Sequence, residues 1–334
     1  MRFTALGLLV AATAAAQPAQ QQVLPFEHTP DPQRAQEIAT SIRTILEPSL
    51  VKLSDDNPPS TLTVGGTAYQ LKAAAWIFTE LDQSAPSPQM HEYRLSGTPE
   101  NVIQVNYVTN TQNVQQFQEI ATAIRTIADI RRVYTYTAPK ALLLRGTADQ
   151  AAVVDWLFPL IDRPLNQPAQ HSISPQQTIP AAMRDRPEEG VIEVFYVGSA
   201  GTVQSFQDLA TTLRTITQLR RVYTYNAAQA IAVRGTSSQL AMAERLFNEL
   251  DRPASASTAG AAEFRATGPD DIVRVFSLAH GASGQDVQTI VPQIRAATSA
   301  QRALSYAGRG LLILRGTAAQ MAAAEHLVQE LDKP

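Results

Sequence analysis

Two arginines and two tyrosines lie within six residues of one another near the middle of the chain: Arg131, Arg132, Tyr134 and Tyr136. The same set returns later as Arg220, Arg221, Tyr223 and Tyr225. In a β-strand, alternate residues share a face, so each pair of tyrosines shares one side of a sheet. Tyr and Arg are enriched at protein interfaces, and aromatic rings also stack on glycans or unpaired bases. We predict an interaction surface here, with a solvated sheet face as the alternative.

The sequence contains no recognised arrangement of catalytic or metal-binding residues. The chain has no cysteine, which excludes disulfides, thiolate metal sites and cysteine nucleophiles. None of the histidines pairs with His, Asp or Glu at a recognised metal spacing, and no serine lies in a nucleophile motif. They are His28, His91, His171, His280 and His326. We therefore expect no catalytic residue, no metal and no cofactor, and predict that the protein is not an enzyme.

Overall charge argues against a general phosphate-binding surface. The 334 residues include 27 basic and 30 acidic side chains, for a net charge of −3. Proteins that bind nucleic acid usually carry a basic excess. Nucleic-acid binding is the least favoured interpretation, and we expect no nucleic-acid partner.

Residues 1–16 have the features of a secretory signal peptide. Arg2 is followed by an apolar stretch over Ala5–Ala16, and Ala14-Ala15-Ala16 fits a small-residue cleavage site before Gln17. The stretch is too short to span a bilayer, and no other segment of the chain is long and apolar enough to do so. We expect a cleaved, exported protein without a transmembrane segment, located in the periplasm.

One sequence unit occurs four times. Residues 102–164 and 191–253 align without a gap, residues 272–334 have the same length, and a divergent copy occupies residues 17–84. We call these repeats 1 to 4 in chain order, so repeat 1 is residues 17–84. Linkers rich in Pro, Gln, Ser or Ala are expected at residues 85–101, 165–190 and 254–271. Repetition at this spacing predicts a tandem array of small domains.

Each repeat is expected to fold as strand, helix, strand, strand, helix, which is an α+β unit. The first helix of repeat 2 places Phe117, Ile120, Ile124 and Ile127 on one stripe, which predicts its buried face. Two short islands in the linkers, residues 92–94 and 263–265, carry Glu-aromatic-Arg and could add an edge strand by forming a hairpin with the next strand.

The last helix of every repeat opens with Gly-Thr-x-x-Gln, at residues 66–70, 146–150, 235–239 and 316–320. This is the pattern of a capping box rather than of a phosphate loop, because no lysine follows the glycine. An arginine also recurs late in each first helix, at Arg43, Arg125, Arg214 and Arg295. Its simplest role is a favourable interaction with the helix dipole.

The units resemble the short N-terminal domains of bacterial secretins. The residues that carry the resemblance are Leu144-Arg145-Gly146-Thr147, Val233-Arg234-Gly235-Thr236, Leu314-Arg315-Gly316-Thr317 and the Leu-Asp helix ends. The resemblance implies βαββα units of ring-building, KH-like topology that make protein contacts in type II and type III secretion or type IV pilus machines. No repeat has the G-x-x-G loop of the KH family. A β-rich C-terminal region that could form the secretin barrel is not expected, since repeat 4 ends at Pro334.

The sequence therefore predicts an exported, non-catalytic scaffold that binds a protein partner in the cell envelope, either a secretin or a second copy of itself. The alternative is a periplasmic module that binds glycan or peptide through exposed tyrosines.

Overall fold

The computed structural model describes residues 20–28, 31–85, 87–164, 172–173, 190–252, 262–266, 271–278 and 284–332. The predicted signal peptide, most of the linkers 165–190 and 254–271, and the last two residues lie outside them. The chain divides into two compact bodies, residues 1–86 and residues 87–334, here called the N-terminal and C-terminal bodies. Within the described residues, no helix is long and apolar enough to cross a membrane.

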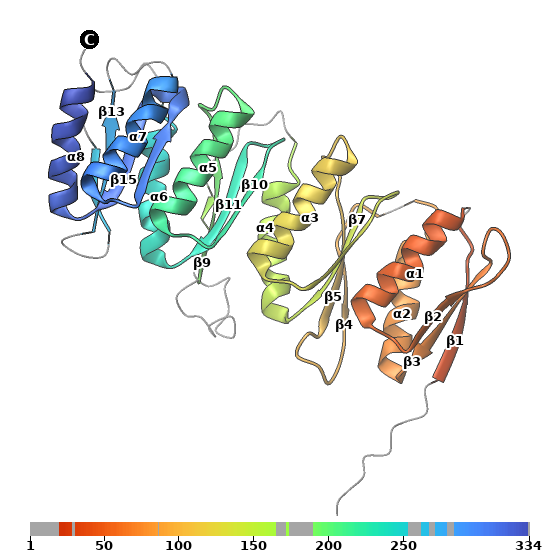
Figure 1. The fold of residues 1–334 in the computed structure, drawn as a ribbon. Coiled ribbons are helices and arrows are strands. Elements are labelled where there is room, and N and C mark those ends of the chain that lie inside the picture. Colours follow the sequence, from red (N-terminus) through yellow and green to blue (C-terminus); the bar gives the residue numbers. More distant parts are fainter. Residues whose placement is uncertain are drawn as a thin grey trace, which may run out of the picture. The chain divides into compact units, whose positions relative to one another are not determined.

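The N-terminal body contains repeat 1, coloured red to orange in Figure 1. Its elements are β1 (Gln20–Pro25), α1 (Pro32–Leu46), β2 (Leu50–Leu53), β3 (Thr61–Gly66) and α2 (Ala68–Leu81). The three strands form an antiparallel sheet in the order β1-β3-β2. Buried apolar residues of both helices, among them Ile38, Ile42 and Ile77, form its core with Leu62 and Val64.

The C-terminal body contains the other three repeats, each with a four-stranded antiparallel sheet and two long helices (Figure 1). Repeat 2 consists of β4 (His91–Arg94), β5 (Val102–Tyr107), α3 (Val114–Ala128), β6 (Arg132–Tyr136), β7 (Ala141–Gly146) and α4 (Ala148–Ile161). Repeat 3 consists of β8 (Ser172–Ile173), β9 (Val191–Tyr196), α5 (Val203–Thr217), β10 (Arg221–Tyr225), β11 (Ala230–Gly235) and α6 (Ser237–Leu250). Repeat 4 consists of β12 (Ala262–Arg265), β13 (Ile272–Ser277), α7 (Gly284–Thr298), β14 (Arg302–Tyr306), the 3₁₀ turn η4 (Ala307–Arg309), β15 (Leu311–Gly316) and α8 (Ala318–Leu331).

The α+β class and its small repeated units are confirmed, and the five-element order recurs in all four repeats. Repeats 2, 3 and 4 each add an edge strand ahead of those elements, giving the sheet orders β4-β5-β7-β6, β8-β9-β11-β10 and β12-β13-β15-β14. Two of the added strands, β4 and β12, contain the islands predicted in the linkers. The third, β8, lies in linker 165–190, where no strand was predicted.

The motif Gly-Thr-x-x-Gln joins the two helices of each repeat. In repeat 2, Gln150 accepts a hydrogen bond from the Thr147 amide at 2.9 Å and donates from Nε2 to the Asp129 carbonyl at 2.6 Å. The glutamine therefore completes the predicted capping box and also binds the C-terminal end of α3. Gly146 is needed for this approach, because a Cβ there would lie 2.8 Å from Gln150 Oε1.

The same double contact occurs in the other three repeats. Gln70, Gln239 and Gln320 donate to carbonyls at the end of the first helix of their own repeat, at 2.9 to 3.3 Å. A glutamate would serve a capping box equally well but has no N–H to donate. This explains why the motif ends in glutamine four times.

The recurring arginine of the first helix has a more specific role than the predicted dipole interaction. Arg125 and Arg214 donate to the carbonyls of Val133 and Val222, at 3.1 and 2.7 Å, and the other two make the equivalent bond. The acceptors lie on β6, β10, β2 and β14, which are edge strands. Each arginine thus fastens the helix to the sheet and shields an edge carbonyl, which discourages pairing with another chain.

The aspartate that ends the last helix binds the loop after the first strand. Asp162 accepts from the backbone amides of Thr109 and Asn110 at 2.8 and 2.9 Å, and Asp251 accepts from Gly198 and Ser199. Asp82 accepts from Glu27 in repeat 1. The Leu-Asp ends are therefore structural residues and not only helix stops.

Replacing Gln320 by Glu should destabilise the protein by about 1–3 kcal/mol, because the carboxylate cannot donate to the Thr298 carbonyl and leaves it unsatisfied. Gln329→Glu, on the exposed side of the same helix, is the control and should change the free energy of unfolding by no more than about 0.5 kcal/mol. Chemical denaturation of both variants measures the difference. Equal stability of the two would contradict the helix-joining role.

Candidate functional site: the interfaces between repeats

The helices of repeat 2 lie between two sheets. One face of α3 and α4 packs on their own sheet, and the other packs on the sheet of repeat 3 (Figure 1). Strand β11 shows the alternation: Ile231 and Val233 belong to the core of repeat 3, whereas Ala230 and Ala232 belong to the core formed with repeat 2. The expectation of a solvated sheet face is therefore wrong for repeat 3.

Repeat 4 packs on repeat 3 in the same way. Leu311 and Ile313 of β15 join the core around α5 and α6, whereas Leu312 and Leu314 face the helices of repeat 4. Tyr306 is buried in the interface, at the position that Tyr225 occupies one repeat earlier. The C-terminal body is thus held together by two equivalent sheet-on-helix interfaces.

The predicted surface residues of repeat 3 divide between this interface and solvent. Tyr225 is only 2% exposed, Tyr223 packs against the same cluster, and Arg220 is exposed. Arg221 donates to Asp129 of repeat 2 at 2.9 Å, and this hydrogen bond holds the pKa of the Asp129 carboxyl below its ordinary range. Three of the four residues, Arg221, Tyr223 and Tyr225, therefore contact repeat 2 of the same chain.

The equivalent residues of repeat 2 are also divided. Tyr136 is buried, Tyr134 is partly buried and Arg131 is exposed. Arg132 forms an ion pair with Glu100 in the turn before β5. Of the eight predicted residues, only Arg131 and Arg220 are fully exposed, so a surface for a separate partner stays a prediction for those two.

Arginines that the surface prediction left out make the most direct contacts between repeats. Arg234, buried at the end of β11, donates from Nη1 to the Ile127 carbonyl of α3 at 3.0 Å. Arg315, at the same position of β15, donates to the Ile216 carbonyl of α5 at 2.6 Å. The last four carbonyls of a helix have no partner within the helix, and a cation there also favours the helix dipole. Each arginine therefore caps the first helix of the preceding repeat.

The second helix of each preceding repeat is capped by other residues. The hydroxyl of Tyr196 donates to the Leu160 carbonyl of α4 at 2.7 Å. Arg309 of η4 donates to the Glu249 carbonyl of α6, the equivalent of Leu160, at 3.3 Å and to the Leu250 carbonyl at 2.9 Å. Here the acceptor is equivalent but the donor differs between interfaces, so no repeated motif marks these residues in the sequence.

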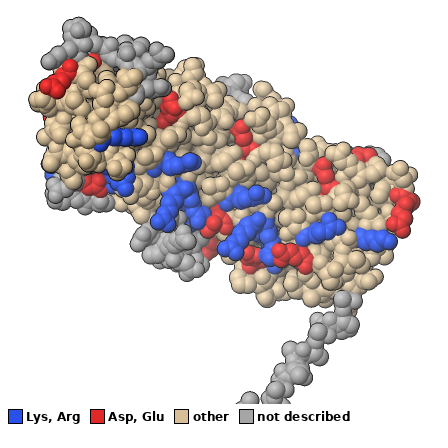
Figure 2. Space-filling view, in the orientation of Figure 1, with Lys and Arg blue, Asp and Glu red and all other residues tan. Residues whose placement is uncertain are grey.

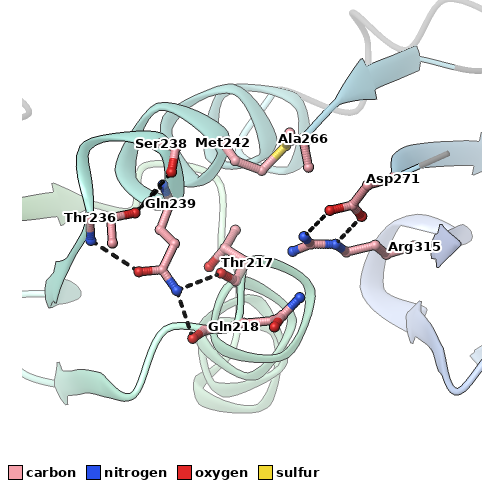
Figure 3. A pocket seen from close by; sticks show the side chains of 9 residues that line it. All are labelled: Thr217, Gln218, Thr236, Ser238, Gln239, Met242, Ala266, Asp271 and Arg315. Atoms are coloured by element: carbon pink, nitrogen blue, oxygen red, sulfur yellow. Dashed lines mark hydrogen bonds and ion pairs between the residues drawn. The ribbon is translucent and has the colours of Figure 1, made fainter. Parts of the chain in front are cut away.

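A polar pocket of about 300 Å³ lies beside Arg315, between repeats 3 and 4 (Figure 3). Asp271 binds the guanidinium in a bidentate ion pair, with N–O distances of 2.7 and 2.6 Å. With its amide oxygen turned toward the arginines, Gln218 accepts from Arg302 at 2.8 Å. The other lining residues are Thr217, Thr236, Ser238, Gln239, Met242 and Ala266.

The polar groups around this pocket mostly bind one another. Gln239 bonds to the Thr236 amide and the Thr217 carbonyl, and Thr236 shares a hydrogen bond with Ser238 (Figure 3). Within the described part of the chain, no cluster of His, Cys, Asp or Glu could hold a metal ion. The arrangement stabilises the junction of two repeats and offers no nucleophile paired with a base.

Basic and acidic side chains both lie on the visible face of each body. Figure 2 shows Lys and Arg side chains with Asp and Glu side chains close to them.

No family model matches the chain, and no curated protein matches it. Among solved structures it is similar to ExeD of Aeromonas hydrophila, with 16% identity, a TM-score of 0.16, and coverage of 74% of this chain and 42% of that one. It is also similar to the ETEC pilotin–secretin complex AspS–GspD, with 11% identity, a TM-score of 0.17, and coverage of 90% and 59%. The chain thus spans less than two thirds of either, and TM-scores this low assign neither fold nor family.

Arg234→Met should destabilise the interface between repeats 2 and 3 by about 1–3 kcal/mol, because the Ile127 carbonyl loses its donor while buried. Arg220→Met, at an exposed arginine of the same repeat, is the matched control and should have little effect. The measurement is the denaturant midpoint of each variant, together with hydrogen exchange at the end of α3. Unchanged exchange there in Arg234→Met would refute the capping role.

Burial raises the pKa of Tyr225 to about 12, with the nearby Asp162 and Glu119 carboxylates adding to the effect. The folded state therefore keeps this proton above pH 10, where the unfolded chain ionises, so stability should fall as the pH rises from 10 to 12. Tyr225→Phe should reduce that loss relative to the wild type. Denaturation between pH 9 and 11.5 tests it, with Tyr69→Phe, 39% exposed, as the control. Parallel curves for Tyr225→Phe and wild type would count against burial of the phenol.

Proposed function

We propose that the protein is an exported, non-catalytic scaffold that binds protein partners in the cell envelope, as the resemblance to secretin N-terminal domains implies. The observation that carries the proposal is the way the repeats bind one another. Each interface combines an apolar sheet face, a helix face and arginine donors to helix ends. These are features of protein–protein recognition.

The proposed location is the periplasm, following cleavage after Ala16. The supporting features are the charged residue, apolar stretch and small-residue site over residues 1–16. The absence of cysteine is compatible with any redox compartment, so it adds nothing here.

The alternative of a glycan- or peptide-binding module loses its main support. Stacking platforms must be exposed, whereas Tyr136, Tyr225 and Tyr306 are each at most 2% exposed. Tyr225 and Tyr306 lie in the cores between repeats of the C-terminal body.

The proposal predicts that the chain is recovered from the periplasmic fraction with Gln17 as its first residue, as measured by intact mass spectrometry. It further predicts that crosslinking in the native envelope captures a component of a secretion or pilus complex. Full-length chain in the cytoplasm, or capture of cytoplasmic proteins alone, would contradict it.

The two exposed arginines of the predicted surface allow a sharper version of the experiment. If Arg131 and Arg220 bind the partner, the double variant Arg131→Ser/Arg220→Ser should capture at least about tenfold less of it, since an interface arginine contributes more than about 1 kcal/mol. Arg245→Ser, at an exposed position on α6, is the control. Equal capture by both variants would exclude these arginines from the contact.

A further inference from the structure

The sheet of repeat 1 lacks a strand that the other three sheets possess. In repeats 2, 3 and 4 the first strand pairs on its outer side with an added strand, β4, β8 or β12. In repeat 1 the sheet ends at β1, and none of the described residues pairs with the outer side of Gln20–Pro25. An edge strand with free N–H and C=O groups is a template for pairing with another chain.

The added strands of the other repeats indicate the sequence and the pairing that such a partner segment would have. Both β4 and β12 run antiparallel to their neighbour and carry the sequence Glu-aromatic-Arg. Glu92 lies opposite Gln104 and accepts from its Nε2 at 3.4 Å, and Glu263 lies opposite Arg274 and accepts from its Nε at 2.9 Å. The acidic residue thus meets a polar side chain of the first strand at the same register.

The residues of β1 that correspond to those of β5 follow from the pairing of β1 with β3 and of β5 with β7. Gln20 lies opposite Gly66 as Val102 lies opposite Gly146, so Gln22 corresponds to Gln104 and Val23 to Val105. The four positions that would face an added strand are therefore Gln20–Val23. Gln22 retains the amide that binds Glu92 in repeat 2.

This edge carries none of the features that usually block strand addition. Gln20–Val23 contains neither a charge nor a proline, and Pro25 lies beyond the four positions. The opposite edge of the same sheet is protected, since Arg43 binds the Val51 carbonyl of β2 and Lys52 lies beside it. Val23 is 58% exposed, second only to Val203 among the large apolar side chains of the residues that the structure describes.

The chain has little sequence with which to cover the edge itself, if the proposed export is correct. Cleavage after Ala16 leaves only residues 17–19 ahead of Gln20. In repeats 2 and 4 the connection between the added strand and the first strand alone takes residues 95–101 and 266–271, and the added strand precedes it. Three residues are too few for both. The residues ahead of Gln20 are then too few to supply the covering strand, which leaves this edge available to another molecule.

We propose that the outer edge of β1, Gln20–Val23, accepts an extended segment of a partner protein as an additional antiparallel strand. The segment carries an acidic residue opposite Gln22 and an apolar or aromatic residue opposite Gln21, the positions of Glu92 and Tyr93 in repeat 2. This inference deepens the proposed scaffold function by naming a contact surface and the chemistry of its partner.

The purified mature chain, starting at Gln17, is tested with a synthetic peptide of residues 90–96 and by fusing residues 90–101 directly ahead of Gln20. Both additions should slow hydrogen exchange of the β1 amides at least tenfold, and scrambled versions should not. A peptide carrying Glu92→Ala should bind at least about fivefold more weakly, because it lacks the carboxylate that would accept a hydrogen bond from Gln22 Nε2.

Proline variants identify the edge that is used. Successive residues of a strand turn their N–H groups to opposite edges, so one of Gln21→Pro and Gln22→Pro removes an outward N–H without disturbing the pairing with β3. That variant should abolish peptide binding while exchange of the β3 amides is unchanged.

Slow exchange of the outward β1 amides, those that do not pair with β3, in the chain alone would overturn the proposal, because the edge would already be covered. Protection that rises with protein concentration would assign the strand to a second copy, and protection by the fusion alone would exclude a separate molecule. No protection by either addition would show that the edge does not accept a strand. These results come from purified protein, so they are independent of whether the chain is exported or captured in the envelope.

Discussion

The carbonyl groups at the C-terminal end of each first helix are the constraint on which the C-terminal body depends. These groups have no partner within the helix, and in repeats 2 and 3 the next sheet buries the carbonyls of Ile127 and Ile216. The glutamine of the capping box satisfies one or two from within the repeat, and the arginine of the next repeat satisfies another. A repeat whose helix end lacked either donor would keep buried, unsatisfied carbonyls and a weaker junction.

Because of this constraint, the helix face and the sheet face of a repeat have different roles. The helices of repeats 2 and 3 receive donors from the following repeat, and the sheets of repeats 3 and 4 supply them, so the two faces of a repeat are not interchangeable. Units of this size bury too little surface to be very stable alone. Burying the sheet on both sides, as β11 and β15 show, makes each repeat part of its neighbour's core. Stability then depends on the junctions as much as on the repeats.

The fold was largely predictable from the sequence because repetition exposes periodicity. The stripe from Phe117 to Ile127, the capping boxes and the islands at β4 and β12 were all visible as patterns. The alternative of a solvated sheet face is wrong for repeats 3 and 4, and a signal against it existed: Ala230–Val233 and Leu311–Leu314 are continuous apolar runs, which are typical of strands buried on both faces. The capping contacts of Tyr196 and Arg309 left no signal, because their positions differ between repeats.

The helix face of repeat 4 differs from those that receive a sheet. Ile127 and Ile216 correspond to Ala297, and the buried Val153 and Met242 correspond to the exposed Ala323. Gln293, also exposed, replaces Ala123 and Thr212. Small and polar residues here remove the apolar area that a further sheet would bury, so this face is suited to end a stack rather than to extend it. A partner protein would then bind more favourably at the edge of a sheet, because backbone hydrogen bonds there supply affinity without a large apolar face.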